Sequence, residues 1–407
     1  MKSSTSKGVE EKFNRFFNQK LSRREFIKKS IIGIGTLALG GYAFNRYVAK
    51  AVTDEYSQVF RNDAPETLWK WSKEADFYVN LPDSVQCKLC PHECRLGIND
   101  RGFCRVRVNK ENKLYTIAYG NPCAVHNDPI EKKPLSHFLP GTSAFSIATA
   151  GCNLRCKNCQ NWQISQFRPE DTQNADLMPE QVVEEAQKVG AHSIAYTYTE
   201  PSIFYEYMID TAKLAKKAGL RNVWVTAGYL NEKPLRKLCK YMDAANIDLK
   251  GFTDRFYIKV TGARLKPVLN SIKILKEENV WFEVTNLIVP TLSDDETLYE
   301  EMVQWLYNNI GPNYPIHISR FHPQYKLVFL PATSIKLLHR LRDIAMNVGM
   351  NYVYIGNIPD NLNKGKDTYC PKCNKVVIER IGYTITQYHI KDGKCTFCDY
   401  KIPGVWK

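Results

Sequence analysis

The sequence predicts an α/β protein whose centre is a partial (β/α)6 barrel. A cysteine-rich extension is expected before the barrel, and a small cysteine-rich module after it. Two observations carry the prediction. Short apolar segments alternate with helical patterns from residue 143 onward, and eleven of the thirteen cysteines fall into three groups. A length of 407 residues is enough for several compact units.

Six segments are expected to be strands because each is short, rich in β-branched and aromatic residues and nearly continuously apolar. Such strands are typical of a parallel sheet that is covered by helices. The helices between them open with Pro, Ser or Asp and close with Gly or Asn. Six strand–helix units predict a partial barrel, and a doubly wound sheet is the alternative. The expected strands are residues 143–150, 193–199, 222–227, 246–249, 281–289 and 316–321, with a further one at 352–356, and the expected helices are 179–190, 202–218, 232–244, 267–279, 294–309 and 334–348.

These patterns divide the chain into five expected parts. They are a signal or anchor at residues 1–51, a linker at 52–80, a cysteine-rich extension at 81–142, the barrel at 143–360, and a zinc-ribbon-like module at 361–407.

The formal net charge of +14 is concentrated near the start of the chain. Residues 1–50 contain eleven Lys or Arg and three Glu, which leaves +6 for all the rest. A nucleic-acid-binding surface needs clustered basic residues, and the sequence after residue 50 has no such cluster. We therefore expect no nucleic-acid partner.

The basic N-terminus has the pattern of a targeting segment. Arg23 and Arg24 precede an uncharged stretch at residues 30–44, and Ala49-Lys50-Ala51 offers a small-x-small cleavage site. This order resembles a twin-arginine export signal. The stretch is shorter than the roughly 20 apolar residues that span a bilayer. We expect an exported protein, or a membrane-associated one if the signal stays on; a basic amphipathic tail on a cytoplasmic protein is the alternative.

The last cysteine group predicts a structural zinc site. Two C-x2-C pairs are separated by 21 residues, so a hairpin can bring four thiolates around one tetrahedral ion. A module this small lacks a large core, and a metal would replace it. Rubredoxin-like iron and disulfides are the alternatives. The four ligands are Cys370, Cys373, Cys395 and Cys398.

The first cysteine group has the spacing C-x2-C-x3-C-x9-C and leaves its metal open. Zinc and an auxiliary iron–sulfur cluster both use four thiolates, and we favour a structural metal. His92 lies within the group but is not expected to be a ligand. The four cysteines are Cys87, Cys90, Cys94 and Cys104.

The middle group has only three members, Cys152, Cys156 and Cys159, in C-x3-C-x2-C spacing directly after the first barrel strand. A closed zinc or iron–sulfur site takes four protein ligands. The missing ligand indicates an open coordination position, which is where a substrate or cofactor can bind.

Polar residues follow other barrel strands at the same end. Glu200 follows the second strand, Asp248 and Lys250 the fourth, and Arg320 and His322 the sixth. Barrel enzymes place their chemistry on loops at the carboxyl ends of the strands. Together with the three cysteines, these residues predict one active site at that rim, although Glu200 alone would be read as a helix-capping carboxylate.

The three-cysteine loop resembles the radical S-adenosylmethionine (SAM) superfamily. A closer resemblance, over about residues 80–407, is to the radical SAM member of the AmmeMemoRadiSam system, and a more distant one is to glycyl radical enzyme activases such as the pyruvate formate-lyase activase. The segments that carry it are CKLCPHECRLG…RGFCRVR, DPIEKKPLSHFLPG, GCNLRCKNCQNW, YTYTEPSIFYEY, NIDLKGF, VTNLIVPTLSDD, ISRFHPQYKL, VYIGNIP and the terminal cysteine pairs.

The resemblance implies a [4Fe–4S] cluster on the three cysteines, with SAM bound to the iron that lacks a thiolate. Two positions depart from the superfamily pattern. Asn158 stands where an aromatic residue usually packs beside the adenine, and the segment around Glu200 replaces the usual Gly-Gly-Glu. Glu200 is carried over as a residue for the SAM amino group. Asp248 and Lys250 are carried over as residues near the SAM carboxylate or ribose.

The implied reaction is reductive cleavage of SAM to a 5′-deoxyadenosyl radical, which abstracts hydrogen from a substrate. The cofactors would do the chemistry, and the barrel would orient them and exclude water. The implied partners are a substrate linked to Memo- and AMMECR-type proteins and a reductant such as flavodoxin or ferredoxin. A glycyl radical enzyme activase is the first alternative. A non-catalytic iron–sulfur electron-transfer or metal-binding protein is the second.

Overall fold

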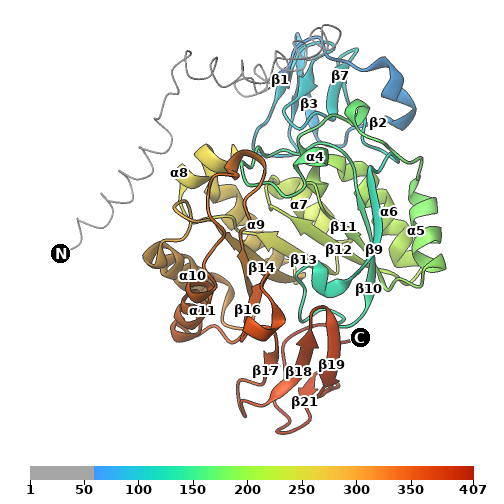
Figure 1. Ribbon diagram of the computed structural model, residues 1–407. Helices are drawn as coiled ribbons and strands as arrows, with labels where there is room; N and C mark the ends of the chain where they lie inside the picture. Colours follow the sequence, from blue (N-terminus) through green and yellow to red (C-terminus); the bar gives the residue numbers. More distant parts are fainter. Residues whose placement is uncertain (1–58) are drawn as a thin grey trace, which may run out of the picture. The chain divides into compact units, whose positions relative to one another are not determined.

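An eight-stranded sheet forms the centre of the computed structural model, which describes residues 59–407 (Figure 1). Seven neighbouring strands run parallel in chain order, and β9 pairs antiparallel with the first of them. A doubly wound sheet would reverse its order at a switch point, so this order confirms the predicted partial barrel. The strands are Ala124–Pro129 (β9), Ser143–Ala148 (β10), Ser193–Tyr196 (β11), Arg221–Thr226 (β12), Ala244–Asp248 (β13), Trp281–Ile288 (β14), Ile316–Arg320 (β15) and Val353–Gly356 (β16).

The sheet is larger than the six predicted strands. The further strand expected at 352–356 is present as β16, and β9 was not anticipated. Its sequence, AVHNDP, is polar, ends in proline and leaves three residues exposed, so it lacks the apolar run of a central strand. An edge position tolerates this composition because only one side of the strand must pair.

The long helices follow the strands as expected. Proline opens α5, the Asp295 side chain accepts a hydrogen bond from the Leu298 N–H at the start of α10, and Gly349 ends α11 in the left-handed conformation. The expected helix at 232–244 stops early because β13 already begins at Ala244. The helices are Pro179–Lys188 (α5), Tyr205–Lys217 (α6), Glu232–Cys239 (α7), Leu265–Glu277 (α9), Glu296–Ile310 (α10) and Ile335–Val348 (α11).

Short helical segments lie in the loops at the carboxyl end of the sheet, and apart from η4, which falls within the helix expected at 202–218, they were not predicted. A single turn is too short to give a periodic pattern. The segments are Trp162–Ser165 (α4), Pro169–Asp171 (η3), Pro201–Phe204 (η4), Asp254–Phe256 (α8), Tyr257–Thr261 (η5, a π turn), Tyr325–Leu327 (η6) and Asp360–Leu362 (η7); Ile130–Lys132 (η2) follows β9.

Two small antiparallel sheets precede the barrel. One has the order β1-β6-β7-β8-β2 and the other β3-β4-β5. Residues 59–80, which were expected within a linker, contain part of both. The elements are Val59–Phe60 (β1), Glu66–Trp71 (η1), Lys73–Glu74 (β2), Tyr78–Leu81 (β3), Ser84–Cys87 (β4), Arg95–Leu96 (β5), Arg101–Gly102 (β6), Arg107–Lys110 (β7) and Lys113–Thr116 (β8).

The C-terminal module is a separate small β structure with its own core. Its four cysteines belong to a cluster with Val377, Ile378, Ile390 and Ile402, and the barrel residues Tyr352 and Tyr354 pack into the same cluster. The strands are Thr368–Tyr369 (β17), Val376–Ile381 (β18), Thr384–Tyr388 (β19), Ile390–Lys391 (β20) and Lys394–Cys395 (β21).

The expected twin-arginine signal and its anchor role at residues 1–51 lie outside the described residues. Within residues 59–407, none of the helices has the length and apolar character needed to cross a bilayer.

Candidate active site

Three cysteines of the loop after β10 line a cavity of about 780 Å³ at the carboxyl end of the sheet. Cys152 and Cys156 are buried and Cys159 is partly exposed. The Leu154 N–H donates to Cys152 Sγ at 3.3 Å, and the Ser165 hydroxyl lies 3.1 Å from Cys159 Sγ. Burial raises the pKa of Cys156 to about 12, and the nearby Lys250 acts in the opposite direction. A volume of this size is within the range of ligand pockets.

The backbone of this loop is held by the loop after β13. The Arg155 N–H donates to the Thr261 carbonyl at 2.7 Å, and the Lys157 N–H donates to the Val260 carbonyl at 2.9 Å. Gly151 starts the loop with φ +99, and a Cβ there would lie 2.5 Å from the Cys104 carbonyl oxygen. Glycine is required at this position by both conformation and space.

Glu200 lies in the wall of the same cavity and is 3% exposed. Its Oε1 accepts from the Ser202 N–H at 3.1 Å, the Ser202 hydroxyl at 2.6 Å and the Thr226 hydroxyl at 2.6 Å. Within the described residues, its Oε2 accepts one hydrogen bond, from the Ala227 N–H at 2.8 Å. The carboxylate therefore caps η4, as its position alone suggests, and keeps room at Oε2 for one more donor.

Asp248 and Lys250 form a polar pair beside the cysteines. Lys250 Nζ donates to Asp248 Oδ2 at 2.9 Å, and the Lys250 N–H donates to the Tyr257 hydroxyl at 3.2 Å. Although burial lowers the pKa of Lys250, Asp248 and Cys156 raise it, and the net shift is upward. Lys250 is therefore a permanent cation in the cavity wall at physiological pH.

Asn158 is buried in the cavity wall, and its Oδ1 has no hydrogen-bond partner in the structure. A buried amide oxygen without a donor is costly unless a ligand supplies one. Three thiols, this free acceptor and the Lys250 cation fit a site for a metal cluster and a polar cofactor. All seven residues predicted for this site line the one cavity: Cys152, Cys156, Asn158, Cys159, Glu200, Asp248 and Lys250.

Two residues expected at the rim after β15 do not line the cavity. Arg320 donates to the Thr333 carbonyl at 2.8 Å, and His322 is exposed. His317 and Ser319 line the cavity in their place. Side chains alternate along a strand, so residues 317 and 319 face one side and residue 320 the other.

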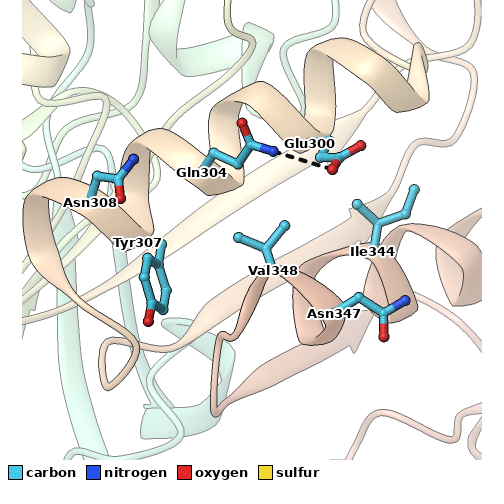
Figure 2. A pocket seen from close by; sticks show the side chains of 7 residues that line it. All are labelled: Glu300, Gln304, Tyr307, Asn308, Ile344, Asn347 and Val348. Carbon is cyan, nitrogen blue, oxygen red and sulfur yellow. Dashed lines mark hydrogen bonds between the residues drawn. The ribbon is translucent and has the colours of Figure 1, made fainter.

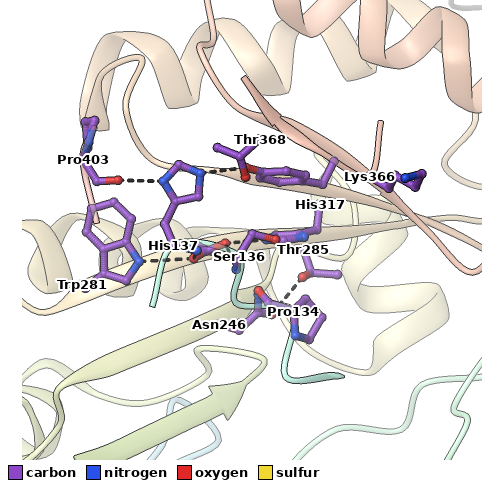
Figure 3. Close-up of polar contacts among 12 residues, drawn as sticks. Pro134, Ser136, His137, Asn246, Trp281, Thr285, His317, Lys366, Thr368 and Pro403 are labelled. Atoms are coloured by element: carbon purple, nitrogen blue, oxygen red, sulfur yellow. Dashed lines mark hydrogen bonds and ion pairs between the residues drawn. The ribbon is translucent and has the colours of Figure 1, made fainter. Parts of the chain in front are cut away.

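A buried network around Glu283 supports the inner wall of the cavity and was not anticipated. Its partners Ser136, His137 and His317 are labelled in Figure 3. Glu283 accepts from the Ser136 N–H at 2.9 Å, the His137 N–H at 2.7 Å and His317 Nε2 at 2.6 Å. Burial raises the pKa of Glu283, but its contacts with His317, His137 and the Ser136 N–H together lower it below the usual value. The network places His317 at the cavity wall with a charged partner behind it.

The network continues into the C-terminal module. His137 Nδ1–H donates to the Pro403 carbonyl at 2.6 Å, and its other ring nitrogen pairs with the Tyr354 hydroxyl at 2.7 Å (Figure 3). Arg380 and Tyr383 of the module also line the cavity. The module therefore forms part of the cavity wall. Sequence reasoning missed this role because the contacts join residues more than 200 positions apart.

Lys133 is a further cavity residue that the sequence did not single out. It is 1% exposed, and its Nζ donates to Asp128 Oδ2 at 2.6 Å. Burial lowers the pKa of Lys133 to about 8, against the opposing effect of Asp128. The amine can therefore gain or lose a proton close to neutral pH.

A second hollow of about 500 Å³ lies between α10 and α11 (Figure 2). Its one carboxylate, Glu300, accepts a hydrogen bond from Gln304 at 3.2 Å. The lining contains no cysteine, histidine or basic side chain. This surface offers no chemistry comparable to that of the cysteine-lined cavity.

The N-terminal cysteine group lines a narrow cavity of its own. His92 also lines this cavity, and its Nε2–H donates to the Asn153 carbonyl at 2.8 Å. Arg107 also lines this cavity and donates to both carboxylate oxygens of Glu206, at 2.8 and 2.7 Å. The four cysteines are Cys87, Cys90, Cys94 and Cys104.

The C-terminal group is a candidate metal centre. Cys370 Sγ lies 3.6 Å from Cys398 Sγ, and Cys373 Sγ lies 3.8 Å from Cys395 Sγ. All four sulfurs lie within 4.8 Å of one another. None of the cysteines in the described residues forms a disulfide, so the disulfide alternative has no support in this structure.

Comparison with known proteins identifies the class. The model of the radical SAM superfamily matches residues 146–306, which include the three-cysteine loop. The chain is 44% identical over 335 residues to the uncharacterized protein MJ0808 of Methanocaldococcus jannaschii, covering 81% of this chain and 98% of that protein. The chain belongs to the same family as MJ0808, and its residues 146–306 form a radical SAM domain. A domain of this superfamily implies a [4Fe–4S] cluster and SAM.

Activating enzymes are among its more distant relatives. The chain is 25% identical over 203 residues to the pyruvate formate-lyase-activating enzyme of Clostridium pasteurianum, covering 48% of this chain and 80% of that enzyme. Among solved structures, a domain of a pyruvate-formate lyase-activating enzyme from Bacteroides vulgatus is 16% identical, with a TM-score of 0.37. The match covers 41% of this chain and 100% of that domain. Streptococcus suis SuiB bound to the precursor peptide SuiA is 15% identical, with a TM-score of 0.41. The match covers 56% of this chain and 51% of the SuiB chain.

Proposed function

We propose that this chain is a radical SAM enzyme that holds its cluster through Cys152, Cys156 and Cys159. One observation carries the proposal: the three cysteines share one cavity with Glu200, Lys250 and an unpartnered Asn158 amide oxygen. Among the described residues that line this cavity, there is no fourth cysteine. One coordination position therefore stays open for a ligand other than the protein.

When bound there, the cluster and SAM would supply a 5′-deoxyadenosyl radical that abstracts hydrogen from the substrate. The chain's own residues bind and orient. Glu200 Oε2 has room to accept from an ammonium group, and Lys250 and Asp248 present a cation and an anion to the polar groups of the cofactor. Asn158 Oδ1 is an acceptor that a base or ribose N–H or O–H can reach only from inside the cavity. Burial of the cysteine loop keeps water from the reacting atoms.

The substrate would occupy the part of the cavity that is formed by the C-terminal module and the Glu283 network. His317, Arg380 and Tyr383 line that part and lie on β15, β18 and the turn after it. We propose that the substrate is linked to Memo- and AMMECR-type proteins, and that flavodoxin or ferredoxin supplies the electron. The motif resemblance alone supports this proposal.

The test is anaerobic reconstitution followed by reduction. We expect the electron paramagnetic resonance spectrum of the reduced cluster to change when SAM is added, and 5′-deoxyadenosine to form. Cys152→Ala should abolish both results, whereas Cys239→Ser, at a buried cysteine outside all three groups, should keep them. An unchanged spectrum and no cleavage product would leave the non-catalytic electron-transfer alternative.

A glycyl radical enzyme activase is the second candidate, because relatives named as a pyruvate formate-lyase-activating enzyme and a putative glycyl-radical enzyme activating enzyme match 48% and 40% of this chain. Reduced enzyme, SAM and a purified pyruvate formate-lyase would then give the doublet spectrum of a glycyl radical on the partner. SAM cleavage without any transferred radical would favour the first proposal.

We also propose that the C-terminal group binds zinc. Four thiolates at about 2.3 Å from a tetrahedral ion lie about 3.8 Å apart, which is close to the 3.6 Å and 3.8 Å that separate the sulfurs of this group. A zinc ion with four thiolate ligands has no open coordination position, so it would hold the module against the barrel and take no part in the reaction. Metal analysis that finds iron in place of zinc at this site would contradict the assignment.

Export or membrane association through the N-terminus remains a proposal that rests on Arg23, Arg24 and the uncharged stretch after them. Fractionation of cells that express the full chain, compared with an Arg23→Lys, Arg24→Lys variant, tests it. Full-length protein that is found only in the cytoplasmic fraction in both cases would refute it.

A further inference from the structure

The cysteine groups differ in how close their sulfur atoms lie. Among the described residues, the C-terminal group is the only one with three or more potential metal-ligand atoms all within 4.8 Å of one another. The N-terminal four cysteines line one cavity, yet no three of their sulfurs meet that spacing. The same is true of the three cysteines in the candidate active site.

Sulfur spacing separates two kinds of metal site. Around one tetrahedral ion, all thiolate pairs lie about 3.8 Å apart, because each metal–sulfur bond is about 2.3 Å long. In an iron–sulfur cube, each thiolate binds a different iron, so the thiolates surround a group of several atoms and are spread further apart. The N-terminal sulfurs do not meet the close spacing of the first case, in contrast to the C-terminal group of the same chain, and this favours the second case.

We propose that Cys87, Cys90, Cys94 and Cys104 hold an iron–sulfur cluster, with one thiolate on each iron of a [4Fe–4S] cube. The sequence left both zinc and an auxiliary iron–sulfur cluster open for this group and favoured a structural metal. The present assignment chooses the cluster. It goes beyond the proposed SAM chemistry, because it concerns a second cluster with no open iron.

The surroundings suit a cluster that is shielded from water. Leu89, Phe103 and Ile203 line the cavity beside the cysteines, and three of the four cysteines are buried. The one charged side chain of the lining, Arg107, is paired with the buried Glu206. An apolar shell of this kind limits solvent access to a cluster and thereby protects it.

The two cysteine loops touch each other directly. The His92 ring donates from Nε2 to the Asn153 carbonyl at 2.8 Å, and Arg155 Nη2 donates to the Phe103 carbonyl. The Cys104 carbonyl packs against Gly151, next to Cys152. The second cluster would therefore lie beside the loop that is proposed to hold the first one.

Metal and sulfide analysis of a variant that lacks the first site tests the proposal. In Cys152→Ala, Cys156→Ala, Cys159→Ala protein, reconstituted anaerobically, we expect iron and acid-labile sulfide in equal amounts, about four of each per chain for a cube, with one zinc. Adding Cys90→Ser and Cys94→Ser to the triple variant should remove this iron. Adding Cys239→Ser instead should leave it in place.

Wild-type protein provides a second measurement that does not depend on the folding of a variant. We expect about eight irons and one zinc per chain, whereas zinc in the N-terminal group would give about four irons and two zincs. The second result, or a triple variant that has zinc and no iron, would overturn the proposal. Failure to cleave SAM by protein that contains both clusters would count against the proposed function alone.

Discussion

The buried ion pair between Arg107 and Glu206 leads to a quantitative prediction for stability. Arg107 on β7 donates two hydrogen bonds to Glu206 on α6, and the side chains are 3% and 1% exposed. Glu206→Gln keeps the shape but leaves a buried guanidinium without a counter-charge, which costs about 3–5 kcal/mol. The unfolding entropy is about 2.1 cal/mol/K per residue, or roughly 0.7 kcal/mol/K for the roughly 350 residues of this unit. The melting temperature should therefore fall by roughly 4–7 °C.

Calorimetry on samples with equal metal content measures this change. The matched control is Glu296→Gln, because the Arg340–Glu296 pair has side chains that are 56% and 42% exposed. An exposed pair contributes less than about 1 kcal/mol, so the control should shift the melting temperature by roughly 1 °C at most. Equal shifts in the two variants would refute the reasoning, because burial would then make no difference to the cost.

Three further predictions concern pH, packing and metal. Burial lowers the pKa of His137 to about 4, below the value of about 6.5 in the unfolded chain. The folded state therefore binds fewer protons between these values. Stability should fall by about 3 kcal/mol as the pH drops from about 6.5 to about 4, and stay reduced below that. Urea unfolding across this range measures the slope, and the same slope in His137→Gln would contradict the assignment. Gly151→Ala should push the cysteine loop away from the Cys104 carbonyl and lower the iron content, since the added Cβ would lie 2.5 Å from that oxygen; a normal iron content would show that the loop tolerates the side chain. Cys370→Ser should remove one zinc per chain and expose residues 361–407 to protease, and an unchanged zinc content would argue against this site.

Local patterns in the sequence were sufficient for the order of strands and helices. The apolar run at 281–289 and the helical pattern at 334–348 match β14 and α11 to within about one residue at each end. These elements are long enough for their periodicity to be read, and their ends carry residues with strong conformational preferences. The polar strand β9 and the single turns around the cavity lack such a pattern, and they appear only when their neighbours are in place.

Six of the seven residues predicted for the candidate active site came from spacing and from position after a strand, and Asn158 came from comparison with the superfamily pattern. Spacing and position after a strand are local properties of the chain. The two rim residues after β15 were placed wrongly because the expected strand, 316–321, gave no register to show which side chains face inward. The structure shows that residues 317 and 319 do so.

The sequence by itself predicted the class of chemistry, because three cysteines in one loop indicate an open coordination position and the surrounding motifs resemble the radical SAM superfamily. Only the tertiary structure decided what surrounds that position. The network from Glu283 through His137 to Pro403, and the placing of Arg380 in the cavity wall, join segments that are more than 100 residues apart. The distances between the sulfur atoms of a cysteine group are also decided by the tertiary structure, because they depend on how several turns pack together. Contacts between distant segments depend on the packing of the whole chain, and no local pattern carries that information.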